Sequence, residues 1–227
     1  MFDADGNQRE FPPGRYRADA QTDWALEYLR ERDRDRPLFL FISYIEPHHQ
    51  NDHAHYEGPI GSKERWADFT PPGDLVDQGG NWREEYPDYL GCCHALDANL
   101  GRLRDELERL GMADNTVILY TSDHGSHFCT RNSEYKRCCH DGCTHIPMIA
   151  YGPGFRGGQV VDQMVSLIDV PPTLLAAGGA ALPVMRGRPL QQLATGTPPA
   201  DWPEDVFIEI SESQCGRAIR TPRYTYS

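Results

Sequence analysis

Hydrophobic and polar residues alternate along the chain in blocks that predict strands and helices in turn. Continuous apolar runs, which are typical of strands buried on both faces, occupy residues 38–45, 116–121 and 148–151. Apolar residues at helical spacing predict helices over 22–32, 88–110 and 170–177. A further strand is predicted at 206–210, with the start of a hairpin in 216–226. This order predicts an α/β fold with a mainly parallel sheet flanked by helices.

Capping and breaking residues predict where the three helices begin and end. Thr22 or Asp23 is expected to cap the first helix, and Asp169 the third. Pro87 is expected at the start of the second helix, where a missing N–H is tolerated, and Gly111 just after its end. The long polar segment between residues 50 and 80 is predicted to be a loop, and loops of this length are usually functional or disordered.

Composition excludes some classes of protein. The formal net charge of −12 over 227 residues argues against general nucleic-acid binding, which needs a basic face. No apolar run is long enough to span a bilayer, and the first twenty residues contain no signal-peptide pattern. The seven cysteines are odd in number and include adjacent pairs, which favours reduced thiols and a cytoplasmic location. The sequence carries no indication of oligomeric state.

Two polar clusters follow predicted strands directly. The first strand ends at Pro47-His48-His49, and the second at Ser122-Asp123-His124-Gly125. Ligands bind at the carboxyl ends of strands in sheets of this class. Carboxylate oxygens favour calcium or magnesium and imidazole favours transition metals, so Asp123 and His124 are candidate metal ligands. The alternative is an aspartate that caps the loop beside a packed histidine.

Three further features of the sequence suggest chemistry. Lys136 could neutralise an oxyanion or help a leaving oxygen depart, although most lysines are simply solvated. His48 could hydrogen-bond an oxyanion or act as an acid, or it could be a rigid loop histidine. The cysteine-rich stretch 138–145, with its histidines, could bind zinc, but its spacing favours a loop of reduced thiols lining a pocket.

The residues and motifs above resemble the sulfatase family of the alkaline-phosphatase-like superfamily. The resemblance implies that His48 holds the sulfate group, and that Asp123 and His124 coordinate a divalent cation, usually calcium. It implies that Lys136 contacts the sulfate and the leaving-group oxygen. The segment 167–175 resembles the family's Asp-x-x-Pro-Thr-Leu helix, whereas His145 stands where the family usually has arginine.

One family motif is missing from this sequence. Sulfatases use a formylglycine made from the Cys or Ser of C/S-x-P/A-x-R, and no cysteine or serine here begins that pattern. The aspartate pair that provides the family's first metal ligands is not found either. We therefore expect residues 1–227 to be part of a single sulfatase-like catalytic domain, partial at both ends. Residues 205–227 are expected to begin the lead into a C-terminal subdomain.

The resemblance implies a function for a longer parent protein. That function is hydrolysis of a sulfate ester, on a sulfated small molecule or carbohydrate, with a formylglycine supplied by the missing part. The substrate-binding residues are expected to include His127, Arg131 and His140. One alternative is a two-metal phosphodiesterase or phosphatase of the same superfamily, which has less need of Lys136. Another is a non-catalytic relative that binds glycan or zinc.

Overall fold

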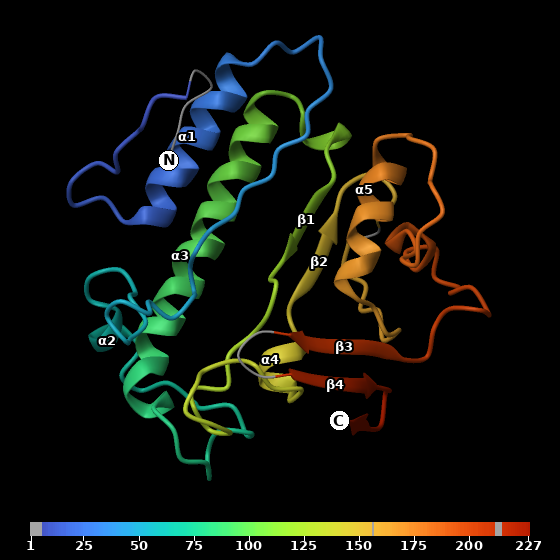
Figure 1. Cartoon of the computed structure of the whole chain (residues 1–227). Helices are drawn as coiled ribbons and strands as arrows, with labels where there is room; N and C mark the ends of the chain where they lie inside the picture. The colour runs from blue at the N-terminus through green and yellow to red at the C-terminus, as the bar shows by residue number, and fades with distance from the viewer. Residues whose placement is uncertain (1–5, 156, 212–214) are drawn as a thin grey trace. The chain divides into compact units, whose positions relative to one another are not determined.

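The computed structural model describes residues 6–155, 157–211 and 215–227, and it divides the chain into two compact units. The first unit is Met1–Met112 and the second is Ala113–Ser227. Helices make up the regular structure of the first unit, and both strands and helices occur in the second (Figure 1). The described helices include none that is long and apolar enough to cross a membrane. The α/β class predicted from the sequence is confirmed.

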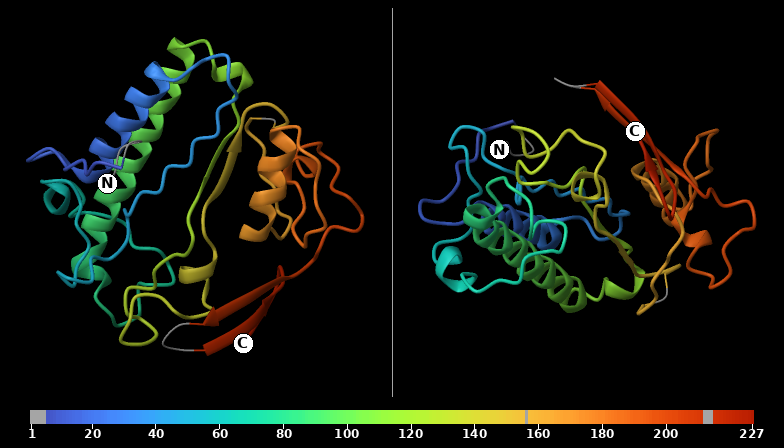
Figure 2. Two further views of the ribbon diagram at one scale, coloured as in Figure 1. Left: turned by 45° about the horizontal axis from the view of Figure 1, so that its top comes forward. Right: turned by 90° about the horizontal axis from the view of Figure 1, so that it is seen from below.

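Two long helices form the frame of the first unit. These are α1 (Arg17–Glu31) and α3 (Trp82–Arg109), with the short helix α2 (Ser62–Arg65) packed on α3. The long helices lie side by side in every view (Figure 2). Both helices bury small and aliphatic side chains: Ala18, Ala25, Leu26, Leu29, Ala95, Leu96, Leu103 and Leu107. Burial of apolar surface of this kind stabilises the helical unit.

Polar groups also join α1 to α3. Asn99 is fully buried, and its amide donates to Asp19 Oδ1 at 2.8 Å and to the Ala95 carbonyl at 2.9 Å. The carboxylate of Glu106, only 6% exposed, accepts hydrogen bonds from Arg30 at 3.0 and 3.1 Å. Arg109 pairs with the same carboxylate. Hydrogen bonds from Arg109 and Arg30 lower the pKa of Glu106 to about 2.

Both long helices begin earlier than the sequence predicts. α1 starts at Arg17, so Thr22 is an interior residue whose hydroxyl donates to the Ala18 carbonyl at 2.8 Å rather than a cap. α3 starts at Trp82, which places Pro87 inside the helix instead of at its start. Tertiary contacts account for the extra turn of α3, because Glu85 is buried and accepts a hydrogen bond from the Tyr56 N–H at 2.7 Å. Gly111 follows the helix with φ of +68°, as predicted.

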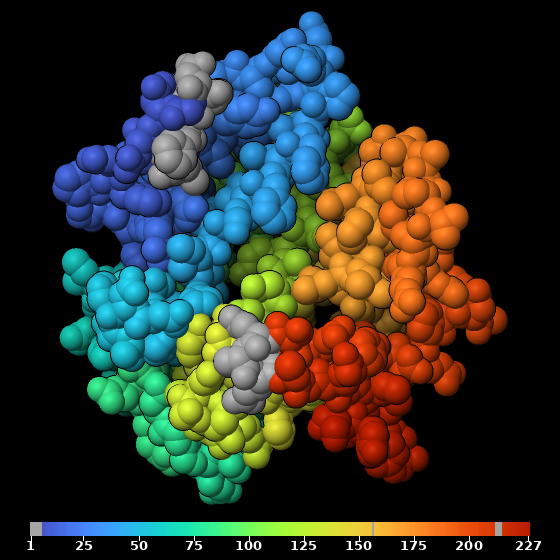
Figure 3. All heavy atoms as spheres, viewed as in Figure 1, coloured from blue at the N-terminus to red at the C-terminus, as the bar shows by residue number. Residues whose placement is uncertain are grey.

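Residues 38–45 are extended but lie in no described strand, which corrects the prediction of a strand buried on both faces. Their side chains alternate between half-buried and exposed positions, and Phe39 and Phe41 are 72% and 78% exposed. Figure 3 shows this segment at the surface of its unit, in light blue. The apolar pattern therefore identified an extended segment correctly. It could not show that the described residues supply no strand to pair with it.

The second unit contains two small antiparallel sheets. In the first, β1 (Ile118–Thr121) pairs with β2 (Met148–Tyr151). In the second, β3 (Val206–Ser211), β4 (Cys215–Arg220) and β5 (Thr225–Tyr226) lie in chain order. Every described strand pair is antiparallel, so the predicted parallel pairing is not found. Parallel neighbours need a crossover connection, usually a helix, whereas the segment between β1 and β2 returns directly with only the short helix α4 (Asp141–Thr144).

The remaining helices of this unit are the turns η1 (Ala113–Asn115), η2 (Leu167–Asp169) and η3 (Leu190–Gln192), and helix α5 (Val170–Ala177). Leu190, Leu193 and Trp202 form a buried cluster against Leu119 of β1 and Met148 of β2. This cluster covers part of the sheet formed by β1 and β2. It fixes the two strands between which the polar loop 122–147 runs.

Asp169 occupies the N-cap position of α5, as predicted, but its side chain makes no capping hydrogen bond to that helix. Its carboxylate instead accepts hydrogen bonds from the Ser166 and Arg188 backbone N–H groups, both at 2.8 Å. The buried Thr173 hydroxyl donates to the Asp169 carbonyl at 2.6 Å and accepts from the Leu190 N–H at 2.9 Å. The bounds of α5 nevertheless match the prediction, and the polar residues join its start to the segment 187–191.

The Glu106 carboxylate offers a test of the first unit. Glu106→Gln is expected to lower the free energy of unfolding at pH 7, because Arg30 and Arg109 lose their shared anion. The depressed pKa means that this stabilisation is present above the ordinary value of 4.5 and is lost as the pH falls toward about 2. Urea unfolding across this pH range should show the gap between wild type and variant closing in acid. Glu108→Gln, exposed on the same helix, is the control, and an equal loss in it would contradict the assignment.

Candidate active site

The polar loop 122–147 leaves and re-enters the sheet at adjacent points. Thr121, the last residue of β1, is paired in register with Met148, the first of β2. The Thr121 hydroxyl also donates to the Pro147 carbonyl at 2.8 Å. The loop is therefore closed at its base by backbone pairing and one side chain. Everything that the sequence predicts at the carboxyl end of β1 is carried on this closed loop.

Within the loop, the backbone at Gly125 packs directly on residues 142–143. The Gly125 N–H donates to the Cys143 carbonyl at 2.8 Å. A Cβ at position 125 would lie 2.2 Å from the Gly142 carbonyl oxygen, a distance that no side-chain carbon adopts. Only glycine permits this approach. The contact fixes where His124 lies relative to the second half of the loop.

A second set of hydrogen bonds joins residues 126–127 to residues 135–136. The His127 N–H donates to the Tyr135 carbonyl at 2.8 Å, and the Ser126 hydroxyl donates to the same oxygen at 3.2 Å. His127 Nε2 lies 3.2 Å from the Lys136 carbonyl oxygen. These bonds place the backbone of Lys136 beside the segment that follows Gly125. The lysine side chain can then reach His124.

The structure brings Asp123, His124 and Lys136 together. Lys136 Nζ lies 3.2 Å from His124 Nε2, and Asp123 Oδ2 lies 3.7 Å from the same nitrogen. His124 Nδ1 is 2.9 Å from the Gly125 carbonyl oxygen, which can only accept, so the ring proton belongs on Nδ1. Nε2 then carries a lone pair toward the lysine ammonium. Three of the four residues predicted for catalysis and metal binding thus lie close together on the loop that follows β1.

The donor atoms at this place fit part of a divalent-cation site. Asp123 is 82% exposed and presents an oxygen, while His124 presents the lone pair of Nε2. The Asp123 Oδ1 accepts from the His124 N–H at 2.9 Å, which holds the carboxylate near the imidazole. Calcium takes six to eight oxygen-rich ligands, so these two residues supply only a share of a full set. The carboxylate and the imidazole are compatible with the predicted cation.

Backbone conformation marks the same loop as unusual. Four described residues other than glycine have positive φ, and three of them lie here: Phe128 at 51°, Cys129 at 58° and Arg137 at 66°. Such conformations cost of order 1–3 kcal/mol each and persist where the surrounding structure enforces them. Left-handed backbone of this kind is concentrated at functional sites. Its density in one loop supports the assignment of this loop as the site.

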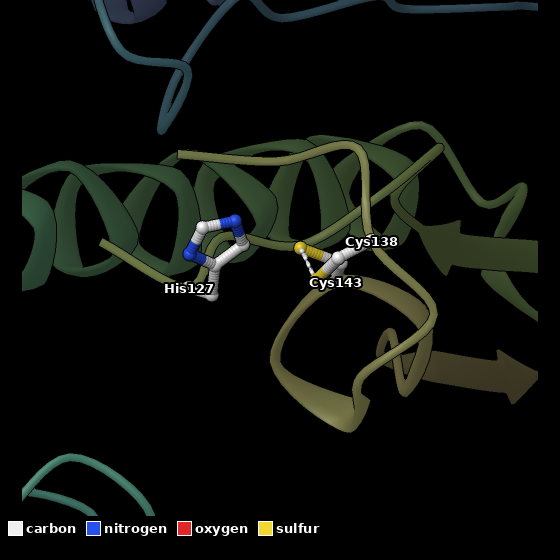
Figure 4. Close-up of side chains that lie close together, drawn as sticks. All are labelled: His127, Cys138 and Cys143. Atoms are coloured by element: carbon white, nitrogen blue, oxygen red, sulfur yellow. Dashed lines mark hydrogen bonds between the residues drawn. The ribbon is translucent and has the colours of Figure 1, made fainter. Parts of the chain in front are cut away.

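A second group of side chains lies behind the first. His127, Cys138 and Cys143 point toward one another (Figure 4), with the two sulfurs 3.6 Å apart. The hydrogen bond between the thiols lowers the pKa of Cys138 and raises that of Cys143, and His127 and His140 lower that of Cys138 further. Burial opposes protonation of His127, but the interactions of the ring with Cys138 and with backbone groups, including the Lys136 carbonyl, together raise its pKa.

The other predicted site residues have different places. His48 lies in the first unit, where its backbone N–H donates to the Ile45 carbonyl at 2.8 Å. The positions of the two units relative to each other are not determined, so its role stays a prediction. Arg131 and His140 are exposed on the loop 122–147, where a ligand could reach them. His127 is only 3% exposed, which does not favour the predicted contact with substrate.

Sequence reasoning missed two features of this loop. One is the close packing of Gly125 on Gly142, for which the only signal was a glycine at each position. The other is the grouping of His127 with Cys138 and Cys143 as one ligand set. The sequence suggested that His127 lies near the pocket of the cysteine-rich loop, but the zinc spacing considered there involved residues 138–145. Both depend on how the loop folds back on itself. Linear spacing does not contain that information.

The fold is that of the alkaline-phosphatase-like α/β proteins. The structure superimposes on a protein of glycosaminoglycan metabolism from Bacteroides thetaiotaomicron with a TM-score of 0.78 and 21% identity, covering 99% of this chain and 51% of that one. It superimposes on the phosphonate monoester hydrolase of Silicibacter pomeroyi with a TM-score of 0.66 and 23% identity, covering 99% and 55%.

The sequence defines the family within that fold. Residues 2–180 match the family model of sulfatases, and the chain belongs to the sulfatase family. It is 39% identical over 95 residues to arylsulfatase K of Canis lupus familiaris, covering 42% of this chain and 18% of that protein. It is 26% identical over 223 residues to an N-acetylglucosamine-6-O-sulfatase of Bacteroides thetaiotaomicron, covering 91% and 40%. The chain thus spans less than half the length of these curated relatives.

The Gly125 contact can be tested by substitution. Gly125→Ala is expected to destabilise the protein by about 1–3 kcal/mol, because the new methyl group would overlap the Gly142 carbonyl. Thermal unfolding would measure the loss. Gly101→Ala is the matched control, since it lies in α3 with open space around it and should stabilise by roughly 1 kcal/mol. A Gly125→Ala protein as stable as wild type would show that the loop does not need this approach.

Proposed function

We propose that this chain supplies the cation-binding and leaving-group part of a sulfatase active site. The observation that carries the proposal is the position of Lys136 Nζ, 3.2 Å from His124 Nε2 and beside the exposed carboxylate of Asp123. An ammonium, an imidazole and a carboxylate converge at the end of one strand. That grouping suits an ester of a strong oxyacid, whose oxygens are negative and whose leaving oxygen needs a proton.

Lys136 has two tasks in this proposal. Its ammonium supplies positive charge beside a sulfate oxygen in a chain that is otherwise strongly acidic, with a formal net charge of −12. Its Nζ also carries a proton that can move to the oxygen of the departing alcohol as the sulfur–oxygen bond breaks. The backbone carbonyl of Lys136 is held by His127 Nε2 at 3.2 Å. The side chain therefore starts from a defined position.

Asp123 and His124 would hold the divalent cation, and we propose calcium. The cation, when bound, would add a Lewis-acidic positive charge beside the sulfate oxygens. The Gly125 carbonyl keeps the His124 proton on Nδ1, which leaves Nε2 available as a ligand. Since no C/S-x-P/A-x-R segment occurs in these residues, the attacking formylglycine would come from another part of a longer protein.

The substrate class that we propose is a sulfated carbohydrate. One relative that aligns with 91% of this chain is named an N-acetylglucosamine-6-O-sulfatase. Arg131 and His140 are exposed on the loop that carries Lys136, so they are the residues that we assign to sugar contacts. The role of His48, which the family resemblance predicts to hold the sulfate group, stays a prediction.

Removal of the ammonium tests the assignment of Lys136. In a full-length protein that carries the nucleophile, Lys136→Ala should lower kcat by about 10²- to 10³-fold on a sulfate ester with a poor leaving group. The loss should be much smaller with a nitrophenyl sulfate, whose leaving oxygen needs no proton. Lys63→Ala is the control, because Lys63 is the other lysine of the chain and pairs with Asp88 at 3.5 Å in the first unit. Equal kcat in wild type and Lys136→Ala would remove the role.

Metal dependence tests the assignment of Asp123. Asp123→Asn should raise the calcium concentration needed for half-maximal activity by about tenfold or more, because a charged oxygen ligand is lost. Activity after chelation and calcium titration would measure it, with Asp114→Asn on the exposed turn η1 as the control. Restoration of activity only by two zinc or manganese ions, with preference for a phosphonate or phosphate ester, would favour the two-metal alternative. No hydrolysis of any ester by the full-length protein would favour a binding role.

A further inference from the structure

The side chains of His127, Cys138 and Cys143 take no direct part in the proposed hydrolysis. One donor atom from each residue lies within 4.8 Å of the others. His127 is 3% exposed and Cys143 is 5% exposed, while Cys138 is half-buried. The two cysteines are free thiols rather than a disulfide. Figure 4 shows the imidazole and both sulfurs directed at a common point.

The geometry of this cluster is close to that of a tetrahedral zinc site. Zinc binds sulfur at about 2.3 Å and imidazole nitrogen at about 2.0 Å, so a tetrahedron has sulfur–sulfur edges of about 3.8 Å and sulfur–nitrogen edges of about 3.6 Å. The observed distance between the Cys138 and Cys143 sulfurs is 3.6 Å. The remaining donor separations, at 4.8 Å or less, need only a small closure of the loop.

The polar atoms around the cluster also suit a metal ion. His127 Nδ1 is buried, and the described residues provide no hydrogen-bond partner for it. The other ring nitrogen lies beside the Lys136 carbonyl oxygen at 3.2 Å. A buried imidazole with two thiols beside it is a compact set of nitrogen and sulfur ligands.

We propose that His127, Cys138 and Cys143 bind one zinc ion, with a fourth position left for water. Two thiolates and an imidazole are ligands that select zinc over calcium or magnesium. The ion would join the loop at both sides of Lys136, since His127 precedes it and the cysteines follow it. Its binding is a separate property from sulfate-ester hydrolysis.

A second group of possible ligands is less suited to this role. His53, His55 and Glu57 also bring donor atoms within 4.8 Å, but His53 is 61% exposed at its side chain and the group contains no sulfur. His53 already pairs with Glu57, which raises the pKa of the imidazole and favours a proton there over a metal. We therefore use this group as the comparison in the experiment.

Cobalt substitution distinguishes the proposed thiolate site from the proposed cation site at Asp123 and His124. The purified full-length protein, kept reduced, would be titrated with cobalt chloride and then with zinc chloride. We expect one cobalt per chain with thiolate-to-cobalt charge-transfer absorption and the strong visible bands of tetrahedral cobalt. Zinc should abolish both. The site of Asp123 and His124 contains no sulfur, so it cannot produce the charge-transfer signal.

Variants locate the ligands. Cys138→Ser, Cys143→Ser and His127→Ala should each weaken cobalt and zinc binding at least tenfold. Cys139→Ser, which changes the adjacent cysteine outside the cluster, and His53→Ala should bind as wild type does. Circular dichroism would show that each variant is folded.

Three results would overturn the proposal. The first is a wild-type protein with no thiolate-to-cobalt absorption, which needs no variant to interpret. The second is a loss of binding in Cys139→Ser or His53→Ala that equals the loss in Cys138→Ser. The third is a disulfide between Cys138 and Cys143 in freshly purified protein, detected by peptide mapping after alkylation, which would make the pair a redox couple instead.

Discussion

The site depends on one close approach of backbone to backbone, between Gly125 and the pair Gly142–Cys143. The hydrogen bond there is 2.8 Å long, and the space beside it would not hold a methyl group. Because β1 and β2 are antiparallel and adjacent, the loop between them has a fixed base. The approach at Gly125 then folds the loop across itself. Without this contact, His124 and Lys136 would lie on two separate arms of a wide and unconstrained loop.

This folding separates the loop into an outer and an inner side. Asp123 is largely exposed and His124 is half-buried, so the outer side is accessible from solvent. His127 and Cys143 are buried, so the inner side holds the loop together. The backbone carbonyl of Lys136 belongs to the inner side and its ammonium to the outer side. A change that loosens the inner side is therefore transmitted to the residue proposed to protonate the leaving group.

The sequence predicted the elements whose pattern is local. The bounds of β2 and α5 were correct, because each is a short apolar run ended by Gly, Pro or Asp. The predicted starts of α1 and α3 were wrong. For α3, the hydrogen bond from the distant Tyr56 N–H to buried Glu85 stabilises a first turn that the local pattern does not predict. Parallel pairing was also wrong, as strand direction depends on what lies between two strands.

The predictions for the site divide in the same way, between residues given by a local motif and residues placed by the rest of the fold. Asp123, His124 and Lys136 could be predicted because the family motif gives their spacing, and the structure brings them together. The exposure of residues 38–45 and the position of His48 could not be predicted in this way. Both depend on parts of the fold that strand pairing within this chain does not define. A sequence pattern identifies residues whose chemistry suits a role in the site. The distances in the structure show which of these residues lie close enough to act together.

A single lone pair links the two roles proposed for the site. With its proton on Nδ1, His124 has one lone pair on Nε2, and in this structure that lone pair faces the Lys136 ammonium at 3.2 Å. The same lone pair is the one that a cation would need. It cannot serve both at once, so cation binding at His124 requires Lys136 to give up this hydrogen bond. The ammonium would then be released toward an anionic substrate, which couples the filling of the metal site to the availability of the proton donor.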